Sequence, residues 1–230
     1  MKKFISLMLI LTILLLPIKA QAVEFSDLAS DHWAKSYIDN LTNEGVISGY
    51  PDGTFRPERY VSFLESLTMI QKIKQPDQAE IENALKSYGS LADKYKISPW
   101  AKEAFTYCLY KNIIYQSEVE DALKKGYLVD DPSLNDAYPK REDLAVYFAR
   151  ALEVPPSYDH SNLLYKDLDQ IGRALGNDLD IADYLSGLVK LGIFDSKGSE
   201  GYFEGDRPFR RAELCKITYL SLIYLANQEN

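Results

Sequence analysis

The sequence predicts a mainly α-helical protein in which three helix–loop–helix repeats pack as one pseudo-threefold domain around a central helical core. Two segments that begin Trp-Ala-Lys, at Trp33 and Trp100, are each followed by apolar residues at helical spacing. A third segment, which begins at Tyr165, has the same order of features without the tryptophan. A repeat of about 50 to 60 residues cannot bury its apolar face alone, so we expect the three to share one core.

The composition fits a globular protein of one or two domains and argues against nucleic acid as a partner. The chain has 230 residues, of which 46% are hydrophobic and 26% are charged. Its 26 basic and 34 acidic residues give a net charge of −8. Phosphate binding needs clustered lysine and arginine, and the sequence contains no basic block.

Residues 1–22 have the pattern of a signal peptide. Two lysines precede an apolar stretch, residues 4–16, and Ala20 and Ala22 form a small-x-small cleavage pattern. The apolar stretch is shorter than the roughly 20 residues that span a bilayer. We therefore expect cleavage after Ala22 and a secreted, non-spanning mature chain that begins at Val23.

The first repeat is expected over residues 23–76. Its first helix starts near Trp33 and ends at Gly45, a glycine placed just beyond the last turn. Tyr-Pro-Asp-Gly at residues 50–53 predicts a turn. The proline fixes φ, the aspartate hydrogen-bonds to the nearby backbone, and the glycine accepts a positive φ. A second helix is expected over Ser62–Lys74.

The second repeat is expected over residues 77–154. Its first helix starts near Trp100, and Asn112 takes the place of the terminating glycine. A stretched, irregular loop over Asp130–Pro139 leads to a helix over Lys140–Leu152. Two additional amphipathic helices are expected between or within the repeats, at Pro76–Ser87 and Glu118–Lys125.

The third repeat is expected over residues 155–230. Tyr165–Leu168 is similar to Phe25–Leu28 of the first repeat, and Gly192 ends the helix that follows. The spacing between these two features is longer than in the first repeat, which indicates an insertion. The last helix is expected over Arg210–Ala226.

These residues together resemble the S-layer homology (SLH) module of exported bacterial proteins. The pattern is closest in the first repeat, over Phe25–Asp27, His32–Trp33, Gly45–Ile47 and Gly49–Pro57. Arg210–Glu213 in the third repeat is similar to the family's Thr-Arg-Ala-Glu signature, and Lys140–Asp143 in the second is a looser version.

The resemblance implies both a fold and a function. Three SLH modules usually form one pseudo-trimer, whose grooves bind secondary cell-wall polysaccharide, often pyruvylated, and so anchor the protein noncovalently. The implied location is the cell wall or cell surface of a bacterium. The ligand-binding residues that it implies are Arg211, Glu213, Arg141, Trp33, Gly49, Asp52, Gly53 and Trp100.

The chemistry of these residue types suits such a ligand. A pyruvyl ketal carries a carboxylate, which the guanidinium fork of arginine meets with two parallel hydrogen bonds. Tryptophan offers a ring face for sugar C–H groups, and glycine lets the backbone approach closely. We expect Arg211 to contribute more than Arg141, because its repeat keeps nearby loop glycines.

The sequence departs from the family pattern in every repeat. The first has Phe63 where the signature arginine belongs, the second has Arg141 but an irregular loop, and the third has Arg211 but no tryptophan. At most one or two competent grooves are therefore expected. Phe63→Arg is expected to restore the signature of the first repeat.

Structural explanations compete with the functional ones for several residues. Trp33 and Trp100 suit a core or staple position at a helix start, with sugar contact as an addition. Arg141 and Arg211 could pair with neighbouring acids such as Glu213, although a cation is unfavourable at a helix N-terminus.

Other polar and sulfur side chains are expected to be structural. Turn and cap chemistry explains Asp27, Asp52 and Asp167 better than calcium does. His32 is expected to be a solvated helix-start residue and His160 a surface residue, and their spacing predicts no metal site. Cys108 and Cys215 are expected to be small buried hydrophobes, with a disulfide between them left open.

Two functions remain after these considerations. The first is anchoring through a wall polysaccharide, and the second is a structural or assembly role in which a degenerate SLH fold binds another envelope protein. An enzyme is not expected, since the sequence shows no constellation of catalytic residues. No cofactor is implied.

Overall fold

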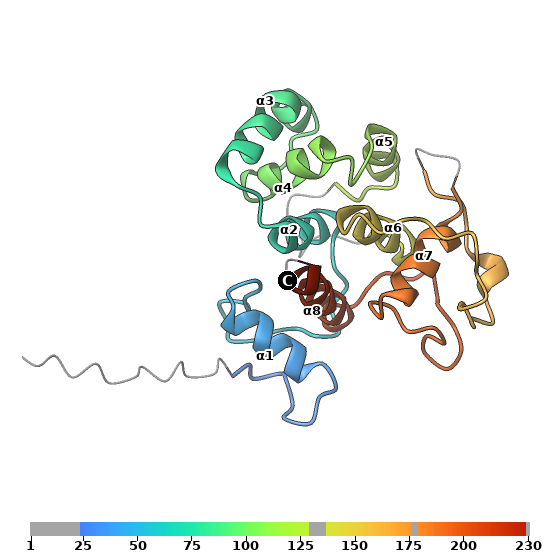
Figure 1. Ribbon diagram of the computed structural model, residues 1–230. Coiled ribbons are helices and arrows are strands. Elements are labelled where there is room, and N and C mark those ends of the chain that lie inside the picture. Colours follow the sequence, from blue (N-terminus) through green and yellow to red (C-terminus); the bar gives the residue numbers. More distant parts are fainter. Residues whose placement is uncertain (1–23, 129–136, 176–178, 229–230) are drawn as a thin grey trace, which may run out of the picture.

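Eight α-helices form most of the regular structure in residues 24–128, 137–175 and 179–228, which the computed structural model describes (Figure 1). They are α1 (Lys35–Asn43), α2 (Phe63–Lys74), α3 (Gln78–Lys94), α4 (Pro99–Tyr110), α5 (Gln116–Lys124), α6 (Arg141–Ala151), α7 (Ile181–Lys190) and α8 (Arg211–Gln228). The mainly α fold class is thereby confirmed. The expected signal peptide and most of the loop expected over Asp130–Pro139 lie outside the described residues.

The second helices of the three expected repeats, α2, α6 and α8, lie at the centre of Figure 1, and the expected first helices lie outside them. Each first helix packs on a second helix: α1 on α8, α4 on α2 and α7 on α6, so that each pair joins two different repeats. α2 also contacts α6 and α8. The apolar faces of the repeats are therefore buried against one another, as expected of short units that cannot bury them alone.

The first helices of all three repeats end in the same backbone conformation. Gly45, Asn112 and Gly192 have φ of 71°, 54° and 71°. In each case the N–H of the next residue donates to a carbonyl in the last turn of the helix, as in Ile113 to Cys108 over 2.8 Å. These residues confirm the predicted helix ends, and asparagine tolerates the left-handed region where most residues do not.

One aspartate ties the turned loop to the start of the repeat in the first and third repeats. The carboxylate of Asp27 accepts from the N–H groups of Phe55 and Arg56, both over 2.7 Å. The carboxylate of Asp167 accepts from Phe203 and Glu204, both over 2.8 Å. The cap role predicted for these aspartates is confirmed, and the two repeats share this device.

The main difference from the sequence prediction is the length of α3. The helix expected over Pro76–Ser87 begins at Gln78, behind a capping box of Asp77 and Glu80, and continues to Lys94. Its apolar face extends through the fully buried Ala92, and α3 packs along α4, so the helix has a reason to continue. The packing of α3 on α4 stabilises the helix enough to offset Gly89, because glycine disfavours the interior of a helix.

Both cysteines are buried hydrophobes, as predicted. Cys108 and Cys215 are free thiols with no exposed surface, so no disulfide joins them. Burial raises the pKa of Cys215 to about 12, which leaves the thiol protonated and inert. No helix among the described residues is both long and apolar enough to cross a membrane.

Candidate functional site

Arg211, the first residue of α8, reaches into the loop of the first repeat. Its N–H donates to the carbonyl of Arg59 over 2.8 Å, and its Nη2 donates to the carbonyl of Ser48 over 2.6 Å. The guanidinium lies 4.6 Å from the ring centroid of Phe55 and 5.3 Å from that of Tyr50. Arg211 is thus bound to the first repeat by backbone and aromatic contacts.

Arg141, the first residue of α6, reaches into the loop of the third repeat in the same way. Its N–H donates to the carbonyl of Arg207 over 2.8 Å, and its guanidinium lies 4.4 Å from the ring centroid of Phe209 and 5.3 Å from that of Phe203. Its Nη1 donates to Oε1 of Glu213 over 3.1 Å. Burial lowers the pKa of Arg141 and Glu213 opposes that effect, so the side chain stays charged at neutral pH.

A hollow of about 210 Å³ lies beside Arg141, and we call it the Arg141 groove. Residues of all three repeats line it: Trp33 from the first, Arg141 from the second, and Asp195, Gly198, Glu213 and Lys216 from the third, with Tyr165, Ile193, Phe194, Ser199, Phe203, Phe209 and Ile217. Three of the predicted site residues, Trp33, Arg141 and Glu213, therefore meet in one place although they are far apart in the sequence.

Glu213 orients the charged side chains of this groove. Its carboxylate accepts two hydrogen bonds from Arg207, over 2.6 and 2.8 Å, one from Arg141 and one from the N–H of Arg210. Burial disfavours the charged form, but the bonds from Arg207 and the charge of Arg141 hold the pKa of Glu213 below its usual range. With its oxygens occupied by arginine, Glu213 positions the guanidinium groups.

The first repeat has a glutamate–arginine pair like that of Glu213 and Arg207. Glu65 pairs with Arg59 over 2.9 Å and forms a capping box with Ser62 at the start of α2. Arg59 stands four residues after Phe55, as Arg207 stands four residues after Phe203. The sequence prediction missed both loop arginines, although this common spacing would have revealed them.

The two tryptophans are not core residues, so the core alternative of the sequence interpretation was wrong. Trp33 is 54% exposed and Trp100 is 46% exposed. Each stands next to a fully buried alanine, Ala34 or Ala101, at the beginning of a helix. The alanines face the core while the neighbouring indoles point outward; in α4 this follows because adjacent helical residues point in different directions.

The two histidines are also more enclosed than the sequence indicated. Nδ1 of His32 accepts from the N–H of Ala34 over 3.1 Å, and its ring stacks on Trp33 with centroids 5.7 Å apart. His160 lies 2.8 Å from the buried carboxylate of Asp183. Neither histidine lines the Arg141 groove.

The glycines and the aspartate of the first-repeat loop build the turn itself. A Cβ on Gly49 would lie 2.2 Å from the ring of Phe25, so only glycine fits. Gly53 has φ of 80°, and Asp52 accepts from Thr54 and Arg56. These bonds hold the pKa of Asp52 at about 2. Gly49, Asp52 and Gly53 do not line the Arg141 groove.

Phe63, which stands where the signature arginine belongs in the first repeat, is a packing residue. Its side chain is buried, and its ring meets that of Tyr147 edge-on with centroids 6.2 Å apart. A deeply buried ion pair, Arg150 with Glu118 at 2.8 Å, lies in the second repeat against the ring of Tyr115. The interior around Phe63 and Arg150 therefore consists of packed apolar side chains and a paired charge.

Comparison with known proteins identifies part of the chain directly. Residues 24–65 match the S-layer homology domain, so the chain contains one such domain. It is 32% identical over 211 residues to the S-layer protein EA1 of Bacillus anthracis, covering 89% of this chain and 21% of that protein.

Two further relatives are an outer membrane protein and an anchoring protein by name. The outer membrane protein SlpA of Thermus thermophilus is 31% identical over 122 residues, 53% of this chain and 12% of SlpA. The cellulosome-anchoring protein of Acetivibrio thermocellus is 32% identical over 83 residues, 34% of this chain and 19% of that protein. The matched part is thus about a fifth or less of each of these longer proteins.

Proposed function

We propose that this protein is a noncovalent anchor of the bacterial cell surface that binds an anionic cell-wall polysaccharide in the Arg141 groove. The observation that carries the proposal is the meeting of a charged arginine with an exposed tryptophan in one hollow. The SLH domain at residues 24–65 and the cell-surface names of the relatives support it.

The same proposal treats the whole mature chain as three SLH repeats, at residues 23–76, 77–154 and 155–230. The packing of helices across the repeats supports it, as do the common helix ends at Gly45, Asn112 and Gly192. The second and third repeats would be divergent copies that keep the packing and lose parts of the motif.

The ligand chemistry follows from the groove. Arg141 keeps its charge in a partly buried position, where a charge-assisted hydrogen bond is stronger than in water. Lys216 adds a second cation at the wall of the groove, and the indole of Trp33 offers an apolar face for a sugar ring. A polysaccharide with carboxylate groups, such as a pyruvylated one, matches this set.

We propose a different order of importance for the two arginines from the one expected from the sequence. Both guanidinium groups use part of their donor capacity inside the protein, Arg211 on the carbonyl of Ser48 and Arg141 on Glu213, so the difference between them lies in the groove. Arg141 shares its groove with Trp33. We therefore place the main ligand contact at Arg141 and a secondary one at Arg211.

An assembly role is the second candidate, and Phe63 favours it. The signature arginine is absent there and the ring of Phe63 packs inside the fold, so the first repeat lacks one cation for a charged polysaccharide. In that case the fold would bind another envelope protein. Under both candidates the protein is exported, is not an enzyme and has no nucleic-acid partner.

Sedimentation with purified cell walls tests the proposal. The mature chain should sediment with walls and should stay in solution after the secondary polysaccharide is removed chemically. Sedimentation that survives this removal would contradict polysaccharide anchoring and would support binding to a protein or to peptidoglycan.

A further inference from the structure

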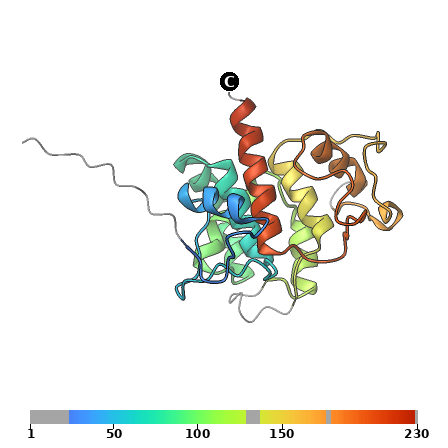
Figure 2. The same ribbon diagram turned by 90° about the horizontal axis from the view of Figure 1, so that it is seen from below.

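The C-terminal half of α8 carries apolar residues that the rest of the fold covers only in part. From Ile217 to Gln228 the helix has no charged side chain. A helix that is apolar on every side is normally buried. Here, Ile223 is 46% exposed, and this end of α8 projects beyond the other helices in Figure 2.

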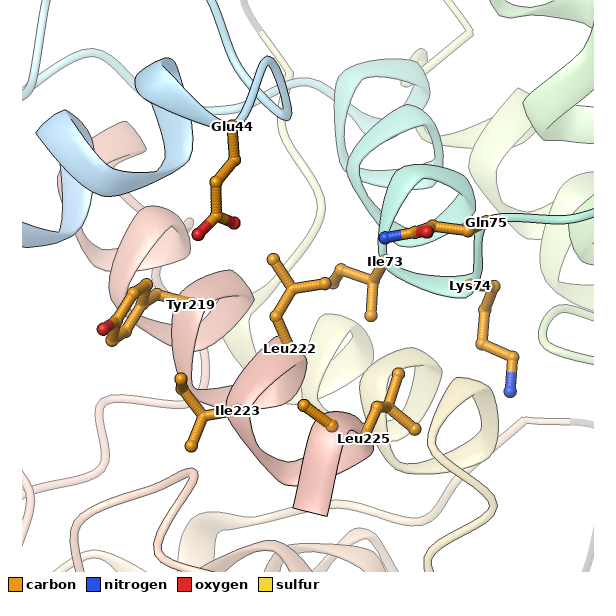
Figure 3. A pocket seen from close by; sticks show the side chains of 9 residues that line it. Glu44, Ile73, Lys74, Gln75, Tyr219, Leu222, Ile223 and Leu225 are labelled. Carbon is orange, nitrogen blue, oxygen red and sulfur yellow. The ribbon is translucent and has the colours of Figure 1, made fainter. Parts of the chain in front are cut away.

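A hollow of about 510 Å³ lies between this end of α8 and the ends of α1 and α2 (Figure 3). Its α8 wall consists of Tyr219, Leu222, Ile223, Leu225 and Ala226. Glu44, just after α1, and Lys74, at the end of α2, lie on opposite sides of it. We call this hollow with the exposed end of α8 the tail face.

We propose that the tail face joins two copies of this chain in a twofold dimer. A twofold axis through the hollow exchanges its two sides, so that Glu44 of each copy faces Lys74 of the partner subunit. The uncharged ends of the two α8 helices then cover each other and remove apolar surface from water.

The charges at the rim favour a second copy over a different occupant. A partner of one charge sign would be attracted by one side of the hollow and repelled by the other, whereas a twofold copy pairs both. Lys74, whose side chain is 17% exposed, also contacts Glu153 at 3.3 Å, but Glu153 is 80% exposed, so a carboxylate of a second copy competes only with a weak surface pair.

The dimer would set the direction of the two anchoring sites. The Arg141 groove uses the first turns of α8, including Glu213 and Lys216, whereas the tail face uses the last turns. An 18-residue helix is about 27 Å long. The two grooves would therefore point away from each other and could hold two polysaccharide chains. This consequence rests on the proposed function, whereas the dimer does not.

Sedimentation equilibrium of the mature chain tests the dimer. We expect twice the monomer mass for the wild type, and an increase of about tenfold or more in the dissociation constant for Ile223→Glu. Leu191→Glu is the matched control, because Leu191 is a similarly exposed apolar residue at the end of α7 and should leave the dimer intact. A monomeric wild type at about 100 μM would overturn the proposal, since stable interfaces bind more tightly than this.

Charge exchange tests the twofold pairing itself. Glu44→Lys and Lys74→Glu, both made in a Glu153→Gln background to remove the neighbouring acid, should each weaken the dimer. The double exchange should restore it, because each new lysine meets a new glutamate across the axis. A double variant weaker than both single variants would contradict this pairing, and circular dichroism confirms that each variant is folded.

Discussion

Glu213 binds two arginines, and this small cluster sets the charge of the Arg141 groove. Arg207 supplies two hydrogen bonds and Arg141 one, all to the same carboxylate. Removing Glu213 would leave two partly buried guanidinium groups close together. The carboxylate of Glu213 is thus a positioning group for the cation that we propose to contact the ligand.

Phe63→Arg tests whether the fold accepts an arginine at the position where the first repeat lacks the signature residue. Phe63 is buried against Tyr147, so the structure argues against the expected gain of function. Replacing this ring by a cation should cost about 3–5 kcal/mol of unfolding free energy, the range found for losing a buried aromatic side chain. Urea denaturation would measure the loss, with Phe63→Leu as a milder control. An undiminished stability together with tighter polysaccharide binding would contradict this expectation.

Asp143 makes stability depend on pH. Burial raises its pKa to about 6, while Lys125 opposes and Glu142 adds to the shift. Its unfolded value is about 3.9, so the folded state binds more protons between these values and stability falls as pH rises through this window. Asp143→Asn should therefore stabilise the protein at pH 7 by about 1–3 kcal/mol and have little effect at pH 4.

Urea denaturation at several pH values checks the role of Asp143. Glu153→Gln is the control, because Glu153 is a largely exposed carboxylate. A difference between Asp143→Asn and wild type that is the same at pH 4 and pH 7 would contradict the assignment.

At the scale of elements, the turned loops are held by carboxylates that each bind two backbone N–H groups. Asp167 is 7% exposed and accepts from Phe203 and Glu204. Asp167→Ala leaves two N–H groups without this acceptor, which should cost about 2–4 kcal/mol of unfolding free energy. Denaturation midpoints would show the loss, whereas Asp52→Ala, at an exposed turn, should change the midpoint little. Equal effects of both changes would contradict the structural role of Asp167.

Most elements could be predicted from local patterns, whereas the difference in α3 has a tertiary cause. Gly45 and Gly192 mark helix ends because positive φ favours glycine, a property readable from sequence. The end of α3 depends on the burial of Ala92 and on packing along α4, which are tertiary effects.

The site was only partly predictable for the same reason. Arg141 and Glu213 stand in motifs, and the resemblance to SLH modules indicated them. That they share a groove with Trp33 depends on how helices of the three repeats pack on one another, which no single motif encodes. Trp33 points outward because its neighbour Ala34 takes the position that faces the core, and the sequence alone does not show which of the two residues does so.

At the scale of the whole molecule, the packing of helices across repeats predicts cooperative unfolding. α1 packs on α8, and α4 packs on α2, so a fragment of residues 23–76 would lose the partners of both its helices. The mature chain should unfold in one transition, and this fragment should show none. Calorimetry would decide, and a cooperative transition of the isolated fragment would contradict a shared core.

Titration calorimetry with a pyruvylated wall-polysaccharide fragment tests the central claim most directly. Arg141→Ala removes a charge-assisted hydrogen bond and should weaken binding about ten- to a hundredfold. Arg210→Ala is the matched control, since Arg210 is an exposed arginine near the start of α8 and pairs with Glu58 at the surface. The account predicts near wild-type affinity for the control. Equal affinities of the wild type and folded Arg141→Ala, or no binding by the wild type, would contradict it.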